Sequence, residues 1–111
     1  MNILSLFKKK YQETTATTLA NEWPQKGAVL LDVRTKNEFA QGHVKGAKNL
    51  DVMDRGFEAK LQQLDPDLIY YVICRSGGRS ASASRTLAAK GFQHVINVRG
   101  GIMSWKGSLV R

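Results

Sequence analysis

The sequence predicts an α/β fold in which helices cover both faces of an open parallel sheet. Three apolar runs, at residues 28–33, 68–73 and 95–98, have the nearly continuous hydrophobicity of strands that are buried on both faces. Helix-forming segments alternate with these runs, and the loops between them are short. The 111 residues are enough for one domain that needs no disulfide or metal to fold. In such a sheet, ligands bind at the carboxyl ends of the strands.

Capping and stop signals place the helices between these strands. Thr35 and Glu38 form a capping box at the start of a short helix, and Gly42 is a suitable C-terminal stop for it. Gly91 is a suitable residue to follow the last predicted helix. We expect the other helices at residues 17–24, 55–64 and 80–90.

The chain has one cysteine, Cys74, which follows the second apolar run and precedes a glycine loop and a predicted helix. A strand, a tight loop and a helix N-terminus direct several backbone N–H groups and a partial positive charge at one point. Such a site stabilises the thiolate, which a free thiol with a pKa of about 8.5 rarely forms at neutral pH. An inert buried cysteine is the alternative, but we would expect it within the apolar run. We therefore interpret Cys74 as a nucleophile.

The positive charge is concentrated in the last third of the chain. Of the net charge of +8, residues 1–70 contribute +1, and residues 71–111, which have no Asp or Glu, contribute +7. Such a field concentrates small anions and stabilises a thiolate. Nucleic-acid binding is the competing interpretation, but recognition motifs and interleaved aromatic residues are missing from the sequence. We therefore expect a small anionic ligand and no nucleic acid.

We expect an N-terminal arm at residues 1–13, one domain at residues 14–107 and a C-terminal tail at residues 108–111. The arm begins with a short apolar segment followed by three lysines, which is too short to span a bilayer. Weak contact with a membrane surface is the less favoured alternative. A single cysteine and the lack of a secretory signal favour a reducing, cytoplasmic location. The oligomeric state is left open.

A series of short motifs extends from about residue 14 to residue 106. These motifs are Leu30-Leu31-Asp32-Val33-Arg34, Glu38-Phe39, Gly42-His43-Val44, Gly46-Ala47, Cys74-Arg75-Ser76-Gly77-Gly78-Arg79-Ser80, Gly91-Phe92, and Val98-Arg99-Gly100-Gly101-Ile102 with Trp105. In their order and spacing the chain resembles a single-domain rhodanese, a thiosulfate-type sulfurtransferase. It departs from the family pattern at Lys45 and at Leu50-Asp51, where prolines are common. Those positions shape a distant turn, so they have little bearing on activity.

The resemblance implies a rhodanese-like fold and a persulfide relay. Cys74 would take a sulfane sulfur from an anionic donor such as thiosulfate and pass it to a thiol, a protein or cyanide, without a cofactor or metal. The loop amides would hold the persulfide, and the two loop arginines would attract the donor. Packing or capping in the first helical turn is the alternative role for Arg79. The implied substrate-binding residues are Arg75, Ser76, Gly77, Gly78, Arg79 and Ser80.

The remaining motif residues are expected to be structural. In the family, Asp32 and Arg34 serve mainly to fix neighbouring loops. We expect His43 to be a hydrogen-bonded structural histidine, since a persulfide relay needs no general base once the thiol is ionised. His94 is expected at the surface, and Trp105 in the core or at a pocket edge. The two histidines and the cysteine lack the spacing of metal ligands.

Two other functions compete with sulfur transfer. A cysteine phosphatase or arsenate reductase of the same fold needs five residues between the cysteine and its arginine, whereas four separate Cys74 from Arg79. Ser80 occupies the position that such an enzyme would need. The second competitor is a sulfur-carrier module that passes its persulfide only to a docked partner. Turnover with small thiols would distinguish that module from an enzyme.

Overall fold

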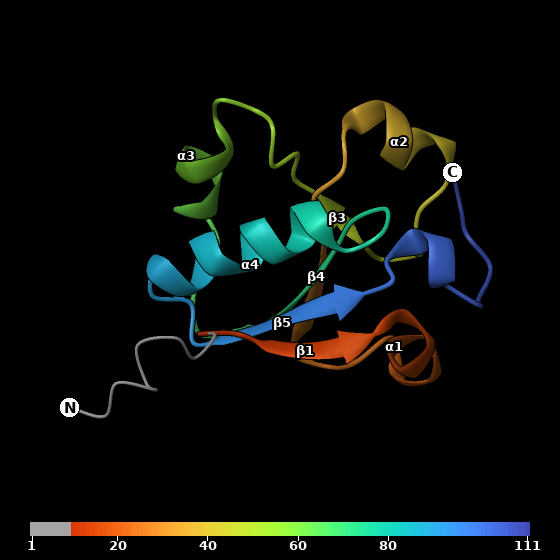
Figure 1. Ribbon diagram of the computed structural model, residues 1–111. Helices are drawn as coiled ribbons and strands as arrows, with labels where there is room; N and C mark the ends of the chain where they lie inside the picture. Colours follow the sequence, from red (N-terminus) through yellow and green to blue (C-terminus); the bar gives the residue numbers. More distant parts are fainter. Residues whose placement is uncertain (1–9) are drawn as a thin grey trace.

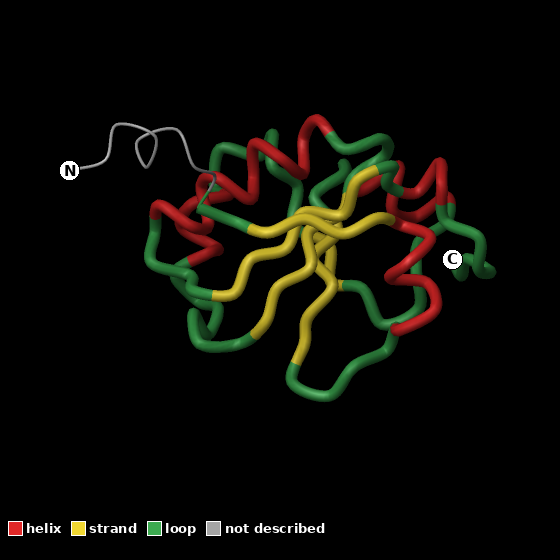
Figure 2. The backbone as a smooth tube through the Cα atoms, turned by 60° about the horizontal axis from the view of Figure 1, so that its bottom comes forward, coloured by secondary structure: helices red, strands yellow, loops and turns green. Residues whose placement is uncertain are grey.

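The computed structural model describes residues 10–111 and has a five-stranded sheet at its centre (Figures 1 and 2). The strand order is β1-β5-β4-β2-β3, and every neighbouring pair is parallel. The α/β fold class predicted from the three apolar runs is therefore confirmed. The strands are β1 (Gln12–Thr15), β2 (Ala28–Asp32), β3 (Lys48–Asn49), β4 (Ile69–Ile73) and β5 (His94–Arg99).

Helices pack against both faces of the sheet and bury a separate apolar core on each side. On one face, the side chains of α3 and α4 pack against β2, β4 and β5. On the other face, α1 packs against the same strands, with η2 at the edge of that core. The helices are α1 (Ala16–Glu22), α2 (Lys36–Gln41), α3 (Phe57–Leu61), α4 (Gly78–Ala89) and the short 3₁₀ helix η2 (Ile102–Ser104).

Strand β4 shows how the sequence divides between the two cores. Side chains alternate along a strand, so Tyr70 and Val72 enter the core under α3 and α4, whereas Tyr71 and Ile73 enter the core under α1. Both faces are apolar because both are covered, which explains the continuous hydrophobic run. The same alternation places Cys74, directly after the strand, on the α4 side.

The predicted helix signals are present. The Thr35 hydroxyl accepts a hydrogen bond from Glu38 N at 3.2 Å, and Glu38 Oε1 accepts one from Thr35 N at 3.1 Å, which completes the capping box of α2. Gly42 is the C-cap of this helix. Gly91 has φ of 95° just beyond α4, in the left-handed region that glycine tolerates. The ranges predicted for α1, α3 and α4 differ from the observed ones by one to three residues at each end.

Both ends of the described chain join the fold. Strand β1 begins within the predicted arm 1–13 and pairs with β5, and the Tyr11 side chain is buried in the core. Residues 1–9 of that arm, including its apolar segment, lie outside the described residues. In the predicted tail 108–111, Val110 pairs with His43 through two backbone hydrogen bonds of 2.8 Å. Between residues 10 and 111, no helix has the length and apolar character needed to cross a membrane.

Candidate active site

Cys74 lies at the carboxyl end of β4, in the middle of the sheet and directly before the loop that leads into α4. Its side chain is only 1% exposed and contributes to the core on the α3 and α4 side. The site is therefore built at the edge of the sheet where parallel α/β folds place their ligands. Low exposure alone would also suit an inert cysteine, so the polar contacts of the sulfur are needed to compare the two interpretations.

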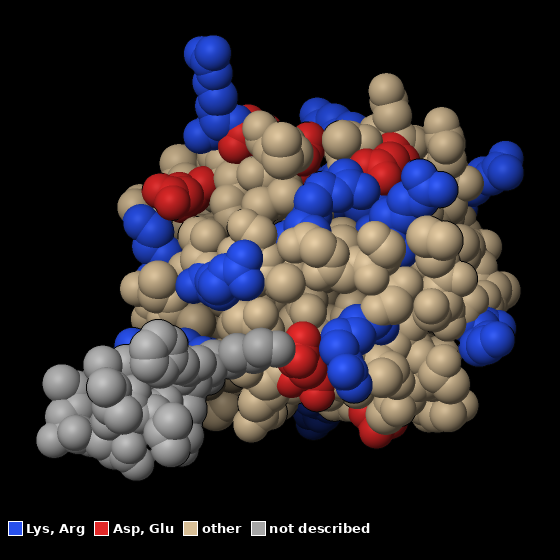
Figure 3. All heavy atoms as spheres, in the orientation of Figure 1, with Lys and Arg blue, Asp and Glu red and all other residues tan. Residues whose placement is uncertain are grey.

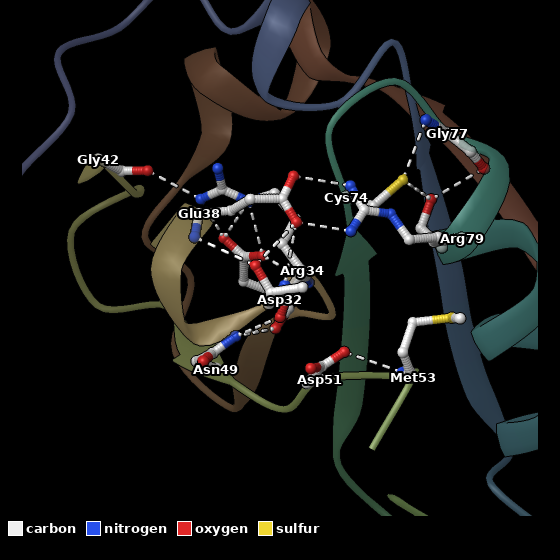
Figure 4. Close-up of polar contacts among 12 residues, drawn as sticks. Asp32, Arg34, Glu38, Gly42, Asn49, Asp51, Met53, Cys74, Gly77 and Arg79 are labelled. Carbon is white, nitrogen blue, oxygen red and sulfur yellow. Dashed lines mark hydrogen bonds and ion pairs between the residues drawn. The ribbon is translucent and has the colours of Figure 1, made fainter. Parts of the chain in front are cut away.

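Polar groups of the loop surround the sulfur of Cys74 (Figure 4). The backbone N–H of Gly77 donates a hydrogen bond to Cys74 Sγ at 3.1 Å. The thiol donates to Ser80 Oγ at 3.4 Å, and the Ser80 hydroxyl donates to the Gly77 carbonyl at 3.0 Å. Gly77 has φ of 127°, which side-chain-bearing residues rarely adopt. A glycine at this position lets the loop turn its amide toward the sulfur.

The pKa of the Cys74 thiol is lowered from its ordinary value. Burial raises this pKa, but hydrogen bonds with the Ser80 hydroxyl and with the amides of Ser80, Gly77 and Ser76 outweigh the effect of burial. In an apolar environment without such donors, burial would leave the pKa raised. The contacts thus favour the thiolate form of Cys74.

The turn after β5 holds the cysteine loop from a second side. The backbone N–H of Ile102 donates to the Cys74 carbonyl at 2.9 Å, and that of Met103 donates to the Arg75 carbonyl at 3.0 Å. Gly101, with φ of 59°, lies so close to the loop that a Cβ there would overlap the Cys74 and Arg75 carbonyls. In the sequence analysis Gly101 was only part of a motif. The pair Gly100-Gly101 directly after a strand was the available signal for this contact.

The two arginines of the loop have different surroundings. Arg75 is exposed, and it forms no ion pair with any carboxylate of residues 10–111. Arg79 donates to both oxygens of Glu38, with Nη1–Oε1 at 2.6 Å and Nη2–Oε2 at 2.8 Å (Figure 4). This pair lowers the pKa of Glu38 to about 2 and raises the pKa of Arg79. In Figure 3, Lys and Arg atoms gather beside the N-terminal end of α4, with acidic atoms among them.

The Glu38–Arg79 contact was missed by sequence reasoning. The sequence assigned Glu38 to the cap of α2 and Arg79 to the attraction of an anion, but 41 positions separate the two residues. No local pattern joins residues so far apart. The structure brings them together because α2 and the N-terminal end of α4 lie at the same edge of the sheet (Figure 1).

A second polar cluster lies in the turn after β2. Arg34 Nη2 donates to Asp32 Oδ2 and to the Gly42 carbonyl, each at 2.8 Å, and Asp32 is fully buried. The Asn49 amide donates to the carbonyls of Asp32 and Arg34 at 3.0 and 2.9 Å. These bonds join β2, the segment after α2 and β3. Such contacts agree with the structural roles expected for Asp32 and Arg34.

The histidines and Trp105 also occupy positions suited to structural roles. His43 Nδ1 lies 2.8 Å from the Phe39 carbonyl, and the His43 ring stacks on the Phe39 ring with centroids 3.7 Å apart. His94 is exposed, and Trp105 packs half-buried against the core under α1. Among residues 10–111, no group of three or more His, Cys, Asp or Glu side chains is placed to hold a metal ion.

A groove of about 370 Å³ opens beside the loop. Cys74 is not among its lining residues, so a molecule in the groove would contact Arg75 and the rim of the loop first. Met103 and Leu109 form an exposed apolar part of this rim. The lining residues are Arg34, Glu38, Gln41, Gly42, Arg75, Ile102, Met103 and Leu109.

Comparison with known proteins gives consistent matches along most of the chain. Residues 15–108 match the family model of the rhodanese-like domain. The chain is 34% identical to thiosulfate sulfurtransferase 16 of Arabidopsis thaliana, a chloroplastic protein, over 88% of this chain and 90% of that one. It is also 34% identical to the thiosulfate sulfurtransferase GlpE of Pseudomonas putida, over 76% and 74% of the two chains. The crystal structure of a rhodanese-related protein from Thermoplasma volcanium superposes with a TM-score of 0.79 at 31% identity, covering 90% of this chain and 98% of that one.

Proposed function

This chain belongs to the rhodanese-like family, and on that premise we propose that it transfers a sulfane sulfur through a persulfide on Cys74. The family and its thiosulfate sulfurtransferase relatives support sulfurtransferase activity in general. Our assignment adds the donor, an anion such as thiosulfate, and the acceptor, a thiol or cyanide. The proposed reaction uses neither a metal nor an organic cofactor.

The first half-reaction forms the persulfide. The Cys74 thiolate attacks the outer sulfur of thiosulfate, the S–S bond of the donor breaks, and its electron pair leaves with sulfite. The transferred sulfur is then held as Cys74–S–S⁻, with charge conserved. In the second half-reaction a thiolate or cyanide attacks that outer sulfur, and the electron pair of the broken bond returns to Cys74. Because one product leaves before the second substrate reacts, the kinetics should be ping-pong.

The observation that carries this proposal is the hydrogen bond from the Gly77 amide to Cys74 Sγ. An amide that already donates to the thiol can donate to the thiolate and, after transfer, to the anionic persulfide. The amides of Ser76 and Ser80 also lower the thiol pKa, so they contribute to the same field. We assign Arg75 to the first attraction of the donor, because its charge is exposed and uncompensated within the described chain.

Access to the sulfur sets a condition on this mechanism. Cys74 is 1% exposed, so a donor must approach through the exposed positions of its loop, Arg75, Ser76 and Gly78. Gly78 has no side chain, and a Cβ placed on it would meet no atom within 4 Å. Open space at this position favours entry of a small donor beside the start of α4.

The contacts of Arg79 count against a phosphatase. A phosphatase arginine must present its guanidinium to a tetrahedral oxyanion, whereas both arms of Arg79 are bound by the Glu38 carboxylate. The loop is also one residue shorter than that of a phosphatase. Sulfur transfer needs backbone amides that stabilise an anion but no arginine that binds a tetrahedral oxyanion, so it fits the loop better.

Intact mass spectrometry after exposure to thiosulfate tests the proposal directly. We expect the protein to gain one sulfur atom and to lose it again, as thiocyanate, when cyanide is added. Cys74→Ser protein should gain no mass under the same conditions. An unchanged mass of the unsubstituted protein would rule out the proposed donor, and addition of sulfur to Cys74→Ser would rule out the nucleophile. Addition without release to cyanide or small thiols would instead identify a carrier module.

A further inference from the structure

The Glu38 carboxylate performs two structural tasks at the same time. Glu38 Oε1 accepts hydrogen bonds from the Thr35 amide and hydroxyl, both at 3.1 Å, and this fixes the carboxylate at the start of α2. Both oxygens then bind the Arg79 guanidinium in a two-armed pair. Figure 4 shows this pair beside Cys74. A carboxylate held from two sides leaves the guanidinium one preferred orientation.

The pair compensates the charge of one loop arginine and leaves the other free. The side chains of Glu38 and Arg79 are each 30% exposed, so solvent screens their attraction only in part. Asp51, which was expected from the sequence to lie in a distant turn, lies close enough to act on Arg79, although more weakly than Glu38 does. At the distance of a bound donor, adjacent opposite charges largely cancel, whereas Arg75 keeps its full charge.

We propose that Glu38 determines how strongly the site selects its sulfur donor by charge. It is a positioning residue, because it acts on the donor through Arg79. By binding both arms of Arg79, Glu38 prevents this arginine from serving as a second cation for the donor. A doubly charged donor therefore gains little from Arg79 over a singly charged one of similar shape. This inference rests on the proposed sulfur transfer and specifies its donor preference.

Two small sulfur donors can measure this selectivity. Thiosulfate is a dianion, and methanethiosulfonate is a monoanion in which a methyl group replaces one anionic oxygen. Thiolate attack on the outer sulfur releases sulfite from the first and methanesulfinate from the second, and both leave the same Cys74 persulfide. The second half-reaction is shared, so the ratio of the two donor kcat/KM values reports the first step. Intrinsic donor reactivity cancels when variants are compared by this ratio.

The Glu38→Gln variant removes the charge and keeps the shape of the side chain. Its amide oxygen can still accept from Thr35, so the cap of α2 is preserved. We expect the thiosulfate-to-methanethiosulfonate ratio to rise about fivefold at low salt and the increase to shrink as salt is added. The Cys74 pKa, followed by thiolate absorbance against pH, should fall because Arg79 becomes a net cation near the sulfur.

A double-mutant cycle that neutralises each charge distinguishes compensation from direct donor binding. In Arg79→Met the unpaired Glu38 repels the dianion, so the ratio should fall several-fold. In the double variant Glu38→Gln/Arg79→Met the ratio should return to within about twofold of the parent, because a neutral pair has been replaced by neutral groups. A double variant far below the parent would mean that Arg79 binds the donor itself and would overturn the proposal.

Glu58→Gln is the matched control. Glu58 pairs with Lys90 at 3.6 Å, at the opposite end of α4 from the cysteine loop, so the same chemical change should leave the ratio unchanged. If Glu38→Gln also leaves both the ratio and the Cys74 pKa unchanged while its melting temperature falls, Glu38 is only a brace and the proposal is wrong. The pKa measurement needs no turnover, so it tests Glu38 even if the parent protein transfers no sulfur.

Discussion

Two turns at the same edge of the sheet combine an arginine with a polar or ionisable partner, yet they are built differently. They follow β2 and β4, which are neighbours in the sheet, with Asp32 in register with Ile73. At the end of β2, the Asp32 carboxylate is fully buried, and the side chain of Arg34, two residues later, binds it. After β4, backbone amides and the Ser80 hydroxyl surround the Cys74 sulfur, and the adjacent Arg75 side chain is exposed.

This difference separates a brace from a binding site. In the β2 turn, the charges of Asp32 and Arg34 satisfy each other, and little capacity is left for a ligand. In the β4 turn, fixed backbone amides converge on Cys74 Sγ, which can carry negative charge, and the charge of Arg75 is available to attract an incoming anion. Similar residue types in similar positions thus serve stability in one turn and chemistry in the other. Substitutions in each turn should affect different measurements.

Cys74→Ser should have the largest effect, and it should fall on activity. A hydroxyl has nearly the same shape as the thiol but cannot form a persulfide, so thiocyanate formation from thiosulfate and cyanide should drop to background. Circular dichroism and the melting temperature should match the parent within a few degrees. Transfer above a tenth of the parental rate would show that Cys74, in the turn after β4, is not the nucleophile.

Asp32→Ala should have the next largest effect, and it should fall on stability. The substitution leaves the Arg34 charge buried without its carboxylate, which typically costs about 3–5 kcal/mol of unfolding free energy. For a domain of this size, we expect the melting temperature to fall by roughly 10–20 °C. Transfer by the folded protein, assayed well below that temperature, should stay within about threefold of the parent.

The milder Asp32→Asn variant keeps the shape and two acceptor lone pairs of the side chain. It provides a test if the alanine variant does not fold. A loss below about 1 kcal/mol in denaturant unfolding of Asp32→Ala would mean that the β2 turn is not the brace described here.

Ser80→Ala should have a smaller effect that depends on pH. The Ser80 hydroxyl helps to lower the Cys74 pKa, so its removal should raise that pKa and reduce the thiolate fraction at neutral pH. Transfer should fall about three- to tenfold near pH 7 and recover at a pH above the raised pKa. A rate loss that is equal at all pH values would contradict this explanation.

Ser84→Ala is the control for that experiment. Ser84 is buried on the same helix, and its hydroxyl makes no hydrogen bond with the described part of the chain. Its removal should leave the pH profile of transfer unchanged.

Deleting residues 1–10 should have the smallest effect. The deletion ends just before Tyr11, which is 8% exposed and packs in the core, so the described fold is preserved. We expect transfer rates within about a factor of two of the parent and a similar melting temperature. Extending the deletion by Tyr11 should lower the melting temperature, because a buried aromatic side chain is lost. A collapse of activity in the shorter deletion would assign a role in the site to the arm.

The sequence predicted those parts of the fold that have local signals. The three central strands were visible as apolar runs because both of their faces are buried, and α2 was visible through its capping box. The edge strands β1 and β3 were not predicted. Both are short and polar, since an edge strand has one partner and more solvent, and their pairing is set by the rest of the sheet. The predicted helix ends differ from the observed ones by up to three residues, because the sequence carries no strong local signal at those ends.

The part of the candidate site that is contiguous in sequence could be predicted. Cys74 and its loop could be identified because strand, glycines and helix are contiguous in the sequence. The contacts from outside the loop could not be identified in this way. Gly101 approaches from the turn after β5, and Glu38 approaches from α2. Both depend on the packing of elements that are distant in sequence.

The hydrogen bonds from the turn after β5 make the chemistry of the loop conditional on complete folding. The carbonyls of Cys74 and Arg75 are bound by the amides of Ile102 and Met103. The loop therefore cannot take its final shape until the last part of the sheet is in place. A nascent or truncated chain that ends before residue 102 would carry a thiol without its fixed surroundings, with ordinary reactivity. The chain thereby couples the appearance of a reactive sulfur to the completion of its own fold.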